Sequence, residues 1–88
     1  MKVRFKRTFL KDMERLPPDV RRKVTHLVFD EIPRLDHIRN LKSLRKISGE
    51  KDYYRIRHGS YRIGLMRRGD DLVFMRILHR RDIYRYFP

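Results

Sequence analysis

The chain has 88 residues, of which 24 are lysine or arginine and 11 are aspartate or glutamate, and its formal net charge at neutral pH is +13. It contains no cysteine, which excludes disulfide frameworks, thiol nucleophiles and cysteine-based zinc sites. No signal peptide and no membrane span are expected, because charges interrupt every apolar run. A basic excess of this size is typical of a protein that binds a polyanion, nucleic acid first among them. We therefore expect one cytoplasmic domain over residues 1–88, with room for one hydrophobic core.

The first third of the chain predicts one strand followed by two helices. Apolar and charged side chains alternate over residues 2–6, which indicates a half-buried strand. Apolar residues at helical spacing then predict a short helix over residues 9–16, with Thr8 as its N-cap. Two prolines at 17–18 end this helix, and a second apolar stripe predicts another helix over residues 19–32.

The middle of the chain gives a weaker pattern. Over residues 36–48, apolar residues recur every three positions, which fits either a helical turn or a loop pinned by its leucines. We favour a loop that leads into a short strand over residues 44–47. The polar residues 48–51 then predict a turn.

A β-hairpin is the clearest prediction from this sequence. Two alternating runs, Tyr53–His58 and Tyr61–Met66, flank the dipeptide Gly59-Ser60. Glycine in the first position of a two-residue connection is the signature of a type II′ turn, and the turn fixes the register of the two strands. This register places one set of side chains on the core face: Tyr54, Ile56, Ile63 and Leu65.

The other face of the hairpin is predicted to carry arginines. Arg57 falls opposite Arg62, and Arg55 falls opposite Gly64, which leaves a hollow beside Arg55. Like charges placed opposite each other destabilise a hairpin by about 0.5–1 kcal/mol. An anion held between the arginines relieves this repulsion, and the guanidinium fork suits phosphate. The alternative is that these side chains simply fan apart into solvent.

A third strand is predicted over residues 72–79. If the preceding loop is odd in length, Val73, Met75 and Ile77 join the core face and Arg76 joins the arginines. A loop of even length would turn Arg76 into the core, so we favour the odd length.

The element order, with helices grouped together and strands grouped together, predicts an α+β domain. A strand and a two-helix hairpin precede an antiparallel sheet of three to four strands, with the helices on one face. The other face is expected to be open and lined with arginine.

The C-terminal residues 79–88 add polar groups that binding alone does not require. His79 can titrate near neutrality, and Tyr84 can stack on a base or move a proton. The alternatives are a strand-end histidine for His79 and a packing role for Tyr84; for Phe87 we favour packing against the sheet. No histidine or carboxylate pair has metal-ligand spacing, and no glycine-rich phosphate loop is present in the sequence.

The segments YYRIRHGSYRIG and ILHRRDIYRYFP resemble the RelE/ParE superfamily of bacterial and archaeal toxins. The tail is more similar to the RelE branch, the messenger-RNA interferases of type II toxin–antitoxin modules. The resemblance implies a RelE-like fold and cleavage of messenger RNA in the ribosomal A site, with no metal or cofactor. It also implies an acidic RelB-like antitoxin that silences the toxin in a hetero-oligomer. Because ParE-type members share the hairpin, the alternatives are a ParE-like inhibitor of DNA gyrase and a catalytically weak RNA-binding relative.

The resemblance also assigns roles to residues. It implies that the catalytic residues are Arg55, Arg57, Arg62, Arg80 and Tyr84, with His79 as a further candidate; Arg76 and Arg81 are expected to bind substrate. The best-known family pattern has lysines at the positions of Arg55 and Arg57. Arginine does not lose its proton in proteins, so the arginines are expected to stabilise the phosphorane. The general base is then Tyr84 or His79, unless the ribosome assists the proton transfer.

Overall fold

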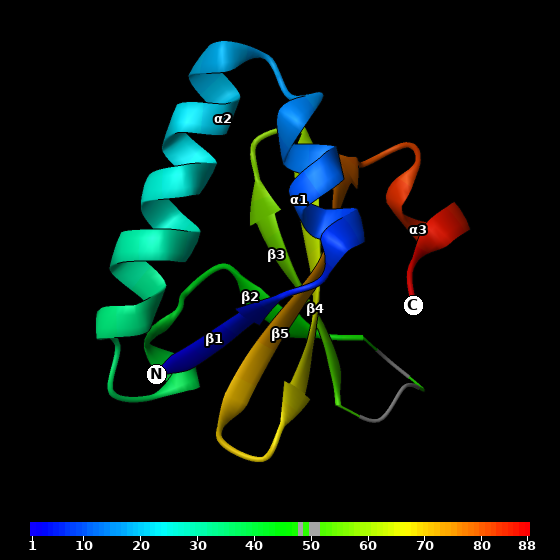
Figure 1. The fold of residues 1–88 in the computed structure, drawn as a ribbon. Helices are drawn as coiled ribbons and strands as arrows, with labels where there is room; N and C mark the ends of the chain where they lie inside the picture. The colour runs from blue at the N-terminus through cyan, green and yellow to red at the C-terminus, as the bar shows by residue number, and fades with distance from the viewer. Residues whose placement is uncertain (48, 50–51) are drawn as a thin grey trace.

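The computed structural model describes residues 1–47, 49 and 52–88, which form a five-stranded sheet with helices (Figure 1). In chain order the elements are β1 (Lys2–Phe5), α1 (Arg7–Glu14), α2 (Pro18–Thr25), a π-helical turn (His26–Glu31), two 3-10 turns (Ile32–Arg34 and Ile38–Asn40), β2 (Leu44–Lys46), β3 (Tyr53–His58), β4 (Tyr61–Arg68), β5 (Asp71–His79) and α3 (Ile83–Tyr86). The order of strands in the sheet is β1-β5-β4-β3-β2. Among the described residues, no helix is long and apolar enough to cross a membrane.

The α+β class is confirmed, and the sheet is wider than the three to four strands expected. Its central strands pair antiparallel as predicted, and the short strand β2 adds to the edge of β3. The extra strand is β1, which pairs in parallel with β5 at the other edge. Alternation in the sequence identifies a strand but not its partner, which is why the sheet's width could not be predicted.

Both predicted helices are present, although α1 begins and ends two residues before the predicted range of 9–16. α2 begins at Pro18 and continues without a break through the π-helical turn and the first 3-10 turn to Arg34. Pro18 fits at the first turn because that position needs no backbone N–H donor. The helices bury one side of the sheet with a stripe of fully or nearly fully buried residues: Phe9, Met13, Leu16, Val24, Val28 and Ile32. The short strand expected before the hairpin is confirmed by β2. The segment ahead of it is a loop that contains the 3-10 turn Ile38–Asn40, so both alternatives for this stretch hold in part. Most of the expected turn at 48–51 lies outside the described residues.

The prediction that Thr8 caps the first helix is wrong. α1 begins at Arg7, with Lys6 at the N-cap position, so Thr8 lies inside the first turn. Its hydroxyl donates instead to the carbonyl oxygen of Met75 on β5, at 2.8 Å. Threonine is a residue type that caps helices, and the sequence near Thr8 gives no sign that a distant strand will bind its hydroxyl instead.

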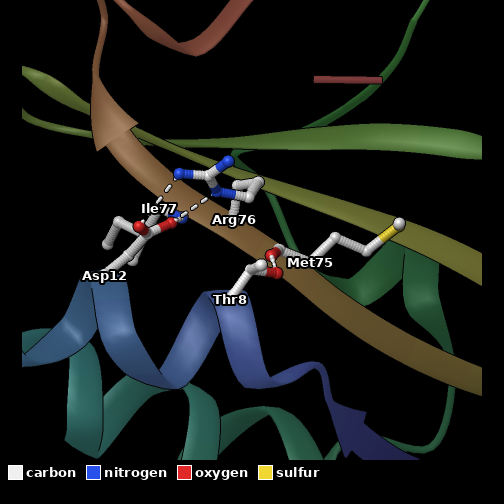
Figure 2. A network of polar contacts seen from close by, with 5 residues as sticks. All are labelled: Thr8, Asp12, Met75, Arg76 and Ile77. Carbon is white, nitrogen blue, oxygen red and sulfur yellow. Dashed lines mark hydrogen bonds and ion pairs between the residues drawn. The ribbon is translucent and has the colours of Figure 1, made fainter. Parts of the chain in front are cut away.

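Asp12, one helical turn further along α1, completes this contact with β5 (Figure 2). Its carboxylate accepts a hydrogen bond from the backbone N–H of Ile77 at 3.1 Å. The same carboxylate accepts from Nε and Nη2 of Arg76 at 2.8 and 3.1 Å. β1 pairs with β5 only as far as Phe74, so α1 satisfies the polar groups of the strand edge that β1 leaves uncovered.

The hairpin has the predicted turn and register. Gly59 has a φ of 56°, in the left-handed region, whereas Ser60 does not, as a type II′ turn requires. Arg57 pairs with Arg62 and Arg55 pairs with Gly64, as expected.

A β-bulge interrupts the pairing of β4 with β5. Gly64 pairs with Arg76, but Leu65 pairs with Phe74, so Met75 is an extra residue on β5. Beyond the bulge, Arg76 lies on the same side of the sheet as Gly64, which confirms its predicted side.

The bulge overturns part of the predicted core. Leu72 and Phe74 before it, and Ile77 after it, are all buried among the core residues. Ile77 was predicted there, but Val73 and Met75 were too, and for these two the predicted face is wrong. Val73 is buried, but it pairs with Met66 and lies on the same side of the sheet as Gly64. The extra residue reverses the alternation halfway along the strand, and nothing in the apolar residues 72–75 reveals where that happens.

Candidate functional site

Arg45, Arg55, Arg57 and Arg62 lie near one another on the sheet face that points away from α1 and α2, here called the arginine face. Arg57 pairs with Arg62 across β3 and β4, and Arg55 pairs with Arg45 of β2 on its other side. Arg45 was missed by the sequence reasoning. Because Arg45 alternates with the apolar Leu44, the sequence indicated that its side chain points away from the core. Only the pairing of β2 with β3 places Arg45 opposite Arg55. A hollow of about 130 Å³ is lined by Arg45, Arg55, Arg57 and Ser43.

The hairpin turn fixes two of the candidate residues. Arg62 folds back over the turn, and its Nη1 donates to the carbonyl oxygens of Gly59 at 2.8 Å and Tyr61 at 2.9 Å. The backbone N–H of Arg80 donates to the carbonyl oxygen of Ser60 at 2.8 Å. The start of the C-terminal tail is thus held beside the same turn as the guanidinium of Arg62.

The pKa of Arg62 depends on the charged groups around it. Partial burial lowers the pKa of Arg62, the charges of Arg57 and Arg55 lower it further, and Arg80 adds a smaller lowering. Tyr84 acts in the opposite direction on this pKa. Within residues 1–47, 49 and 52–88, no carboxylate lies within 4.0 Å of a side-chain nitrogen of Arg55, Arg57, Arg62 or Arg80. The charge of the cluster is thus not balanced by a carboxylate among the described residues, an arrangement that suits an anionic ligand.

The arginine face is not fully open, contrary to expectation, because the C-terminal segment packs on it. α3 lies on the far side of the sheet from α2 (Figure 1). Ile83 and Phe87 are buried, and the ring of Phe87 lies over Gly64 and meets the ring of Tyr53 edge-on, with 5.6 Å between centroids. The hollow predicted beside Arg55 exists because Gly64 has no side chain, and Phe87 fills it. The packing role expected for Phe87 is confirmed.

Tyr84 and His79, the two candidate proton acceptors, are separated by the sheet. Tyr84 is 56% exposed on α3 and lies near enough to Arg62 to affect its pKa. His79 pairs with Tyr61, whose ring packs against the core on the helix side, and the two ring centroids are 5.7 Å apart. Nδ1 of His79 accepts a hydrogen bond from the backbone N–H of Arg81 at 3.2 Å. His79 therefore faces away from the arginines that Tyr84 accompanies.

Arg76 also stands apart from the arginine cluster. Its bidentate bond to Asp12 raises its pKa, and its guanidinium carbon lies 5.4 Å from the ring centroid of Tyr86 on α3. Through these contacts Arg76 links α1 to the segment that carries Tyr84. Within the described part of the chain, no group of three histidine, aspartate or glutamate residues is arranged to hold a metal ion.

Gly64→Ala is expected to displace the C-terminal segment, because its new Cβ would lie 2.5 Å from Cδ2 of Phe87. Overpacking of this kind costs about 1–3 kcal/mol of unfolding free energy. In Phe87→Leu the smaller side chain makes room, so adding Gly64→Ala to that variant should cost less than adding it to the wild type. Urea unfolding of the four proteins measures this coupling. Equal costs in both backgrounds would show that Phe87 does not pack on Gly64 in solution.

The fold and the basic site agree with a family comparison. A family model described as "ParE toxin of type II toxin-antitoxin system, parDE" matches residues 3–84 of this chain. The chain therefore belongs to the RelE/ParE superfamily of type II toxins.

Individual relatives refine this assignment. The chain is 44% identical to Toxin RelE3 of Methanocaldococcus jannaschii over the whole of both chains. It is 36% identical to Toxin RelG of Mycobacterium tuberculosis, with 94% of each chain covered. Its structure superposes on the RelB-RelE antitoxin-toxin complex from Methanococcus jannaschii with a TM-score of 0.81, 42% identity, and coverage of 97% of this chain and 99% of that chain. Within the superfamily, the chain is a toxin of the RelE type.

Proposed function

We propose that this toxin is a ribosome-dependent endoribonuclease that cleaves messenger RNA in the A site. The observation that carries the proposal is the cluster of Arg55, Arg57, Arg62 and Arg80, which has no carboxylate among the described residues and lies beside Tyr84. Guanidinium groups bind phosphate through paired hydrogen bonds. The phenolic hydroxyl of Tyr84 beside them provides the second requirement, a group that can move a proton.

In the proposed reaction, the ribose 2′-oxygen attacks the adjacent phosphorus and the bond from phosphorus to the 5′-oxygen breaks. The products are a 2′,3′-cyclic phosphate and a free 5′-hydroxyl, so no water, metal or cofactor enters the step. Negative charge grows on the phosphorane oxygens, where Arg55, Arg57 and Arg62 stabilise it. None of these three can accept the 2′ proton, because arginine stays protonated in proteins.

Tyr84 is the group proposed to carry the proton from the 2′-hydroxyl to the leaving 5′-oxygen, because a phenolic hydroxyl can donate one proton and accept another. Its side chain is exposed next to the arginines, whereas His79 lies on the helix side of the sheet. Two further arginines are proposed to hold flanking phosphates. Arg81 is exposed at the start of the tail. Arg76 binds Asp12 through Nε and Nη2, so its Nη1 takes no part in those bonds.

The proposal includes a protein partner. Cells that make such a toxin need an antitoxin, and the net charge of +13 suits an acidic one. Similar toxins have been solved as RelB-RelE complexes, from Methanococcus jannaschii among other sources. We expect a RelB-like antitoxin to bind this chain in the cytoplasm as a hetero-oligomer and to cover the arginine face.

Inducing the chain in cells and mapping RNA 5′ ends tests this function. Growth should stop, and new 5′ ends should appear at fixed positions within codons. Tyr84→Phe should reduce these ends by about 100-fold, because general acid–base catalysis contributes at least that much. His79→Ala, the matched loss on the opposite face, should leave them unchanged. Unaffected growth with no codon-position cleavage would contradict the proposal, and loss of cleavage in His79→Ala alone would contradict the role of Tyr84.

A second candidate function is inhibition of DNA gyrase, which the ParE description of the matching family model favours. The same induction separates the two. DNA damage with intact messenger RNA would indicate a gyrase inhibitor, whereas codon-position cleavage without DNA damage would indicate an endoribonuclease.

A further inference from the structure

A second hollow opens between the long helix and the outer edge of the sheet, here called the α2–β3 hollow. Its volume is about 510 Å³, within the range of small-molecule binding sites. Most of its wall comes from six residues: Arg22, Lys23, His26, Leu27, Arg57 and His58.

The hollow exists because β2 is too short to cover β3. β2 has three residues, which pair with Tyr54–Ile56, whereas β3 continues through Arg57 and His58. At this end of the strand, the pairing among the described residues is extended by a long bond from the N–H of Arg57 to the carbonyl oxygen of Ser43, at 3.4 Å. The end of β3 is therefore uncovered, and its side chains can be approached from both faces of the sheet.

The α2–β3 hollow adjoins the arginine site, because two residues line both. Ser43 and Arg57 line it, and the same two residues line the 130 Å³ hollow that also contains Arg45 and Arg55. A chain bound at the arginine site can thus pass around the open edge of β3, along Arg57, without crossing a buried region.

The chemistry of the hollow suits one nucleotide. Arg22 and Lys23 supply positive charge at its rim, and Leu27 supplies an apolar surface. Glu31, an acidic residue of the wall, has its Oε1 3.2 Å from Nε2 of His26, so this carboxylate already has a partner within the chain. The histidine rings offer flat surfaces on which a base can stack.

We propose that the α2–β3 hollow binds a nucleotide of the substrate RNA that flanks the scissile phosphate. Its phosphate contacts Arg22 and Lys23, and its base lies against Leu27 and the ring of His58. Arg57 bridges the two sites and holds the strand at the edge of the sheet. This inference rests on the proposed endoribonuclease function, and it adds a place where the sequence of the RNA can be read. An acidic antitoxin segment is the competing occupant; the shared lining with the arginine site favours RNA.

RNA binding by variants of α2 tests the proposal. The probes are two single-stranded RNAs, a trinucleotide and a hexanucleotide, each with a 2′-O-methyl group at every ribose to prevent cleavage. Arg22→Ala and Lys23→Ala should each weaken binding of the hexanucleotide by about fivefold and reduce its salt dependence by about 0.7 in the log–log slope. Binding of the trinucleotide should weaken less, because it can bind at the arginine site in a register that leaves the hollow empty. Arg21→Ala is the matched control, since this exposed residue of the same helix does not line the hollow.

The outcomes separate this inference from the proposed function. If Arg62→Ala weakens hexanucleotide binding while Arg22→Ala and Lys23→Ala do not, the hollow holds no nucleotide although the arginine site still binds RNA. If the two α2 variants weaken binding of the purified antitoxin and leave the hexanucleotide unaffected, the hollow belongs to the protein partner. If the wild type binds neither RNA, the inference is wrong, whereas the ribosome-dependent function is decided separately by codon-position cleavage in cells. Circular dichroism of each variant confirms that the fold is retained.

Discussion

Replacing Arg62 with alanine is expected to lower RNA cleavage by about 100- to 1,000-fold, the effect of removing one preorganised donor from a site where charge develops. Arg62 is held over the hairpin turn by bonds to Gly59 and Tyr61, so its guanidinium is already oriented before substrate arrives. Cleavage of messenger RNA by purified ribosomes with added toxin measures the effect. The fold should survive, because the hydrogen bonds to these carbonyl groups are near the surface.

Two variants make the Arg62 result specific. Arg68→Ala removes the same charge from the other end of β4, where the side chain is exposed, and should leave cleavage within about twofold of the wild type, because long-range surface charge is screened by salt. Arg62→Lys keeps the charge but loses the planar fork, so it should recover only part of the activity. Equal losses in Arg62→Ala and Arg68→Ala would reduce the role of Arg62 to general charge attraction.

The arginine pairing was predictable from the sequence because it depends on a local feature. Gly59 permits the left-handed φ of the turn, and a two-residue turn leaves one register for the strands that it joins. Arg57 opposite Arg62 follows directly. The convergence of charge could therefore be derived before any tertiary contact was known.

The parts of the site that escaped prediction depend on contacts between distant segments. Gly64 indicated a hollow, but its occupant, Phe87, lies more than twenty residues away and reaches it only through the fold of the tail. Arg45 joins the cluster only because β2 pairs with β3. His79 and Tyr84 are close in sequence yet face opposite sides, since the chain turns between β5 and α3.

The contact between α1 and β5 is expected to be a main source of stability, and Asp12→Ala should lower the free energy of unfolding by about 3 kcal/mol. Asp12 is only 5% exposed, and its carboxylate serves both Arg76 and the N–H of Ile77. Its removal leaves a partly buried guanidinium and a strand-edge donor without their partner. Asp12→Asn keeps an acceptor for Ile77 but loses the charge, so its cost should be smaller. Urea unfolding followed by circular dichroism measures both.

The same substitution also tests whether stability and activity are linked through Arg76. Arg76 lies against Tyr86 in the segment that carries Tyr84, so losing Asp12 releases one anchor of that segment. At a temperature where Asp12→Ala is fully folded, its cleavage rate should still fall, whereas Glu14→Ala, an exposed loss on the same helix, should change neither stability nor rate. A destabilised but fully active Asp12→Ala protein would show that Arg76 fastens the helix to the sheet and does not position the tail. A stable Asp12→Ala protein would show that the ion pair only offsets the cost of its own desolvation, as some partly buried pairs do.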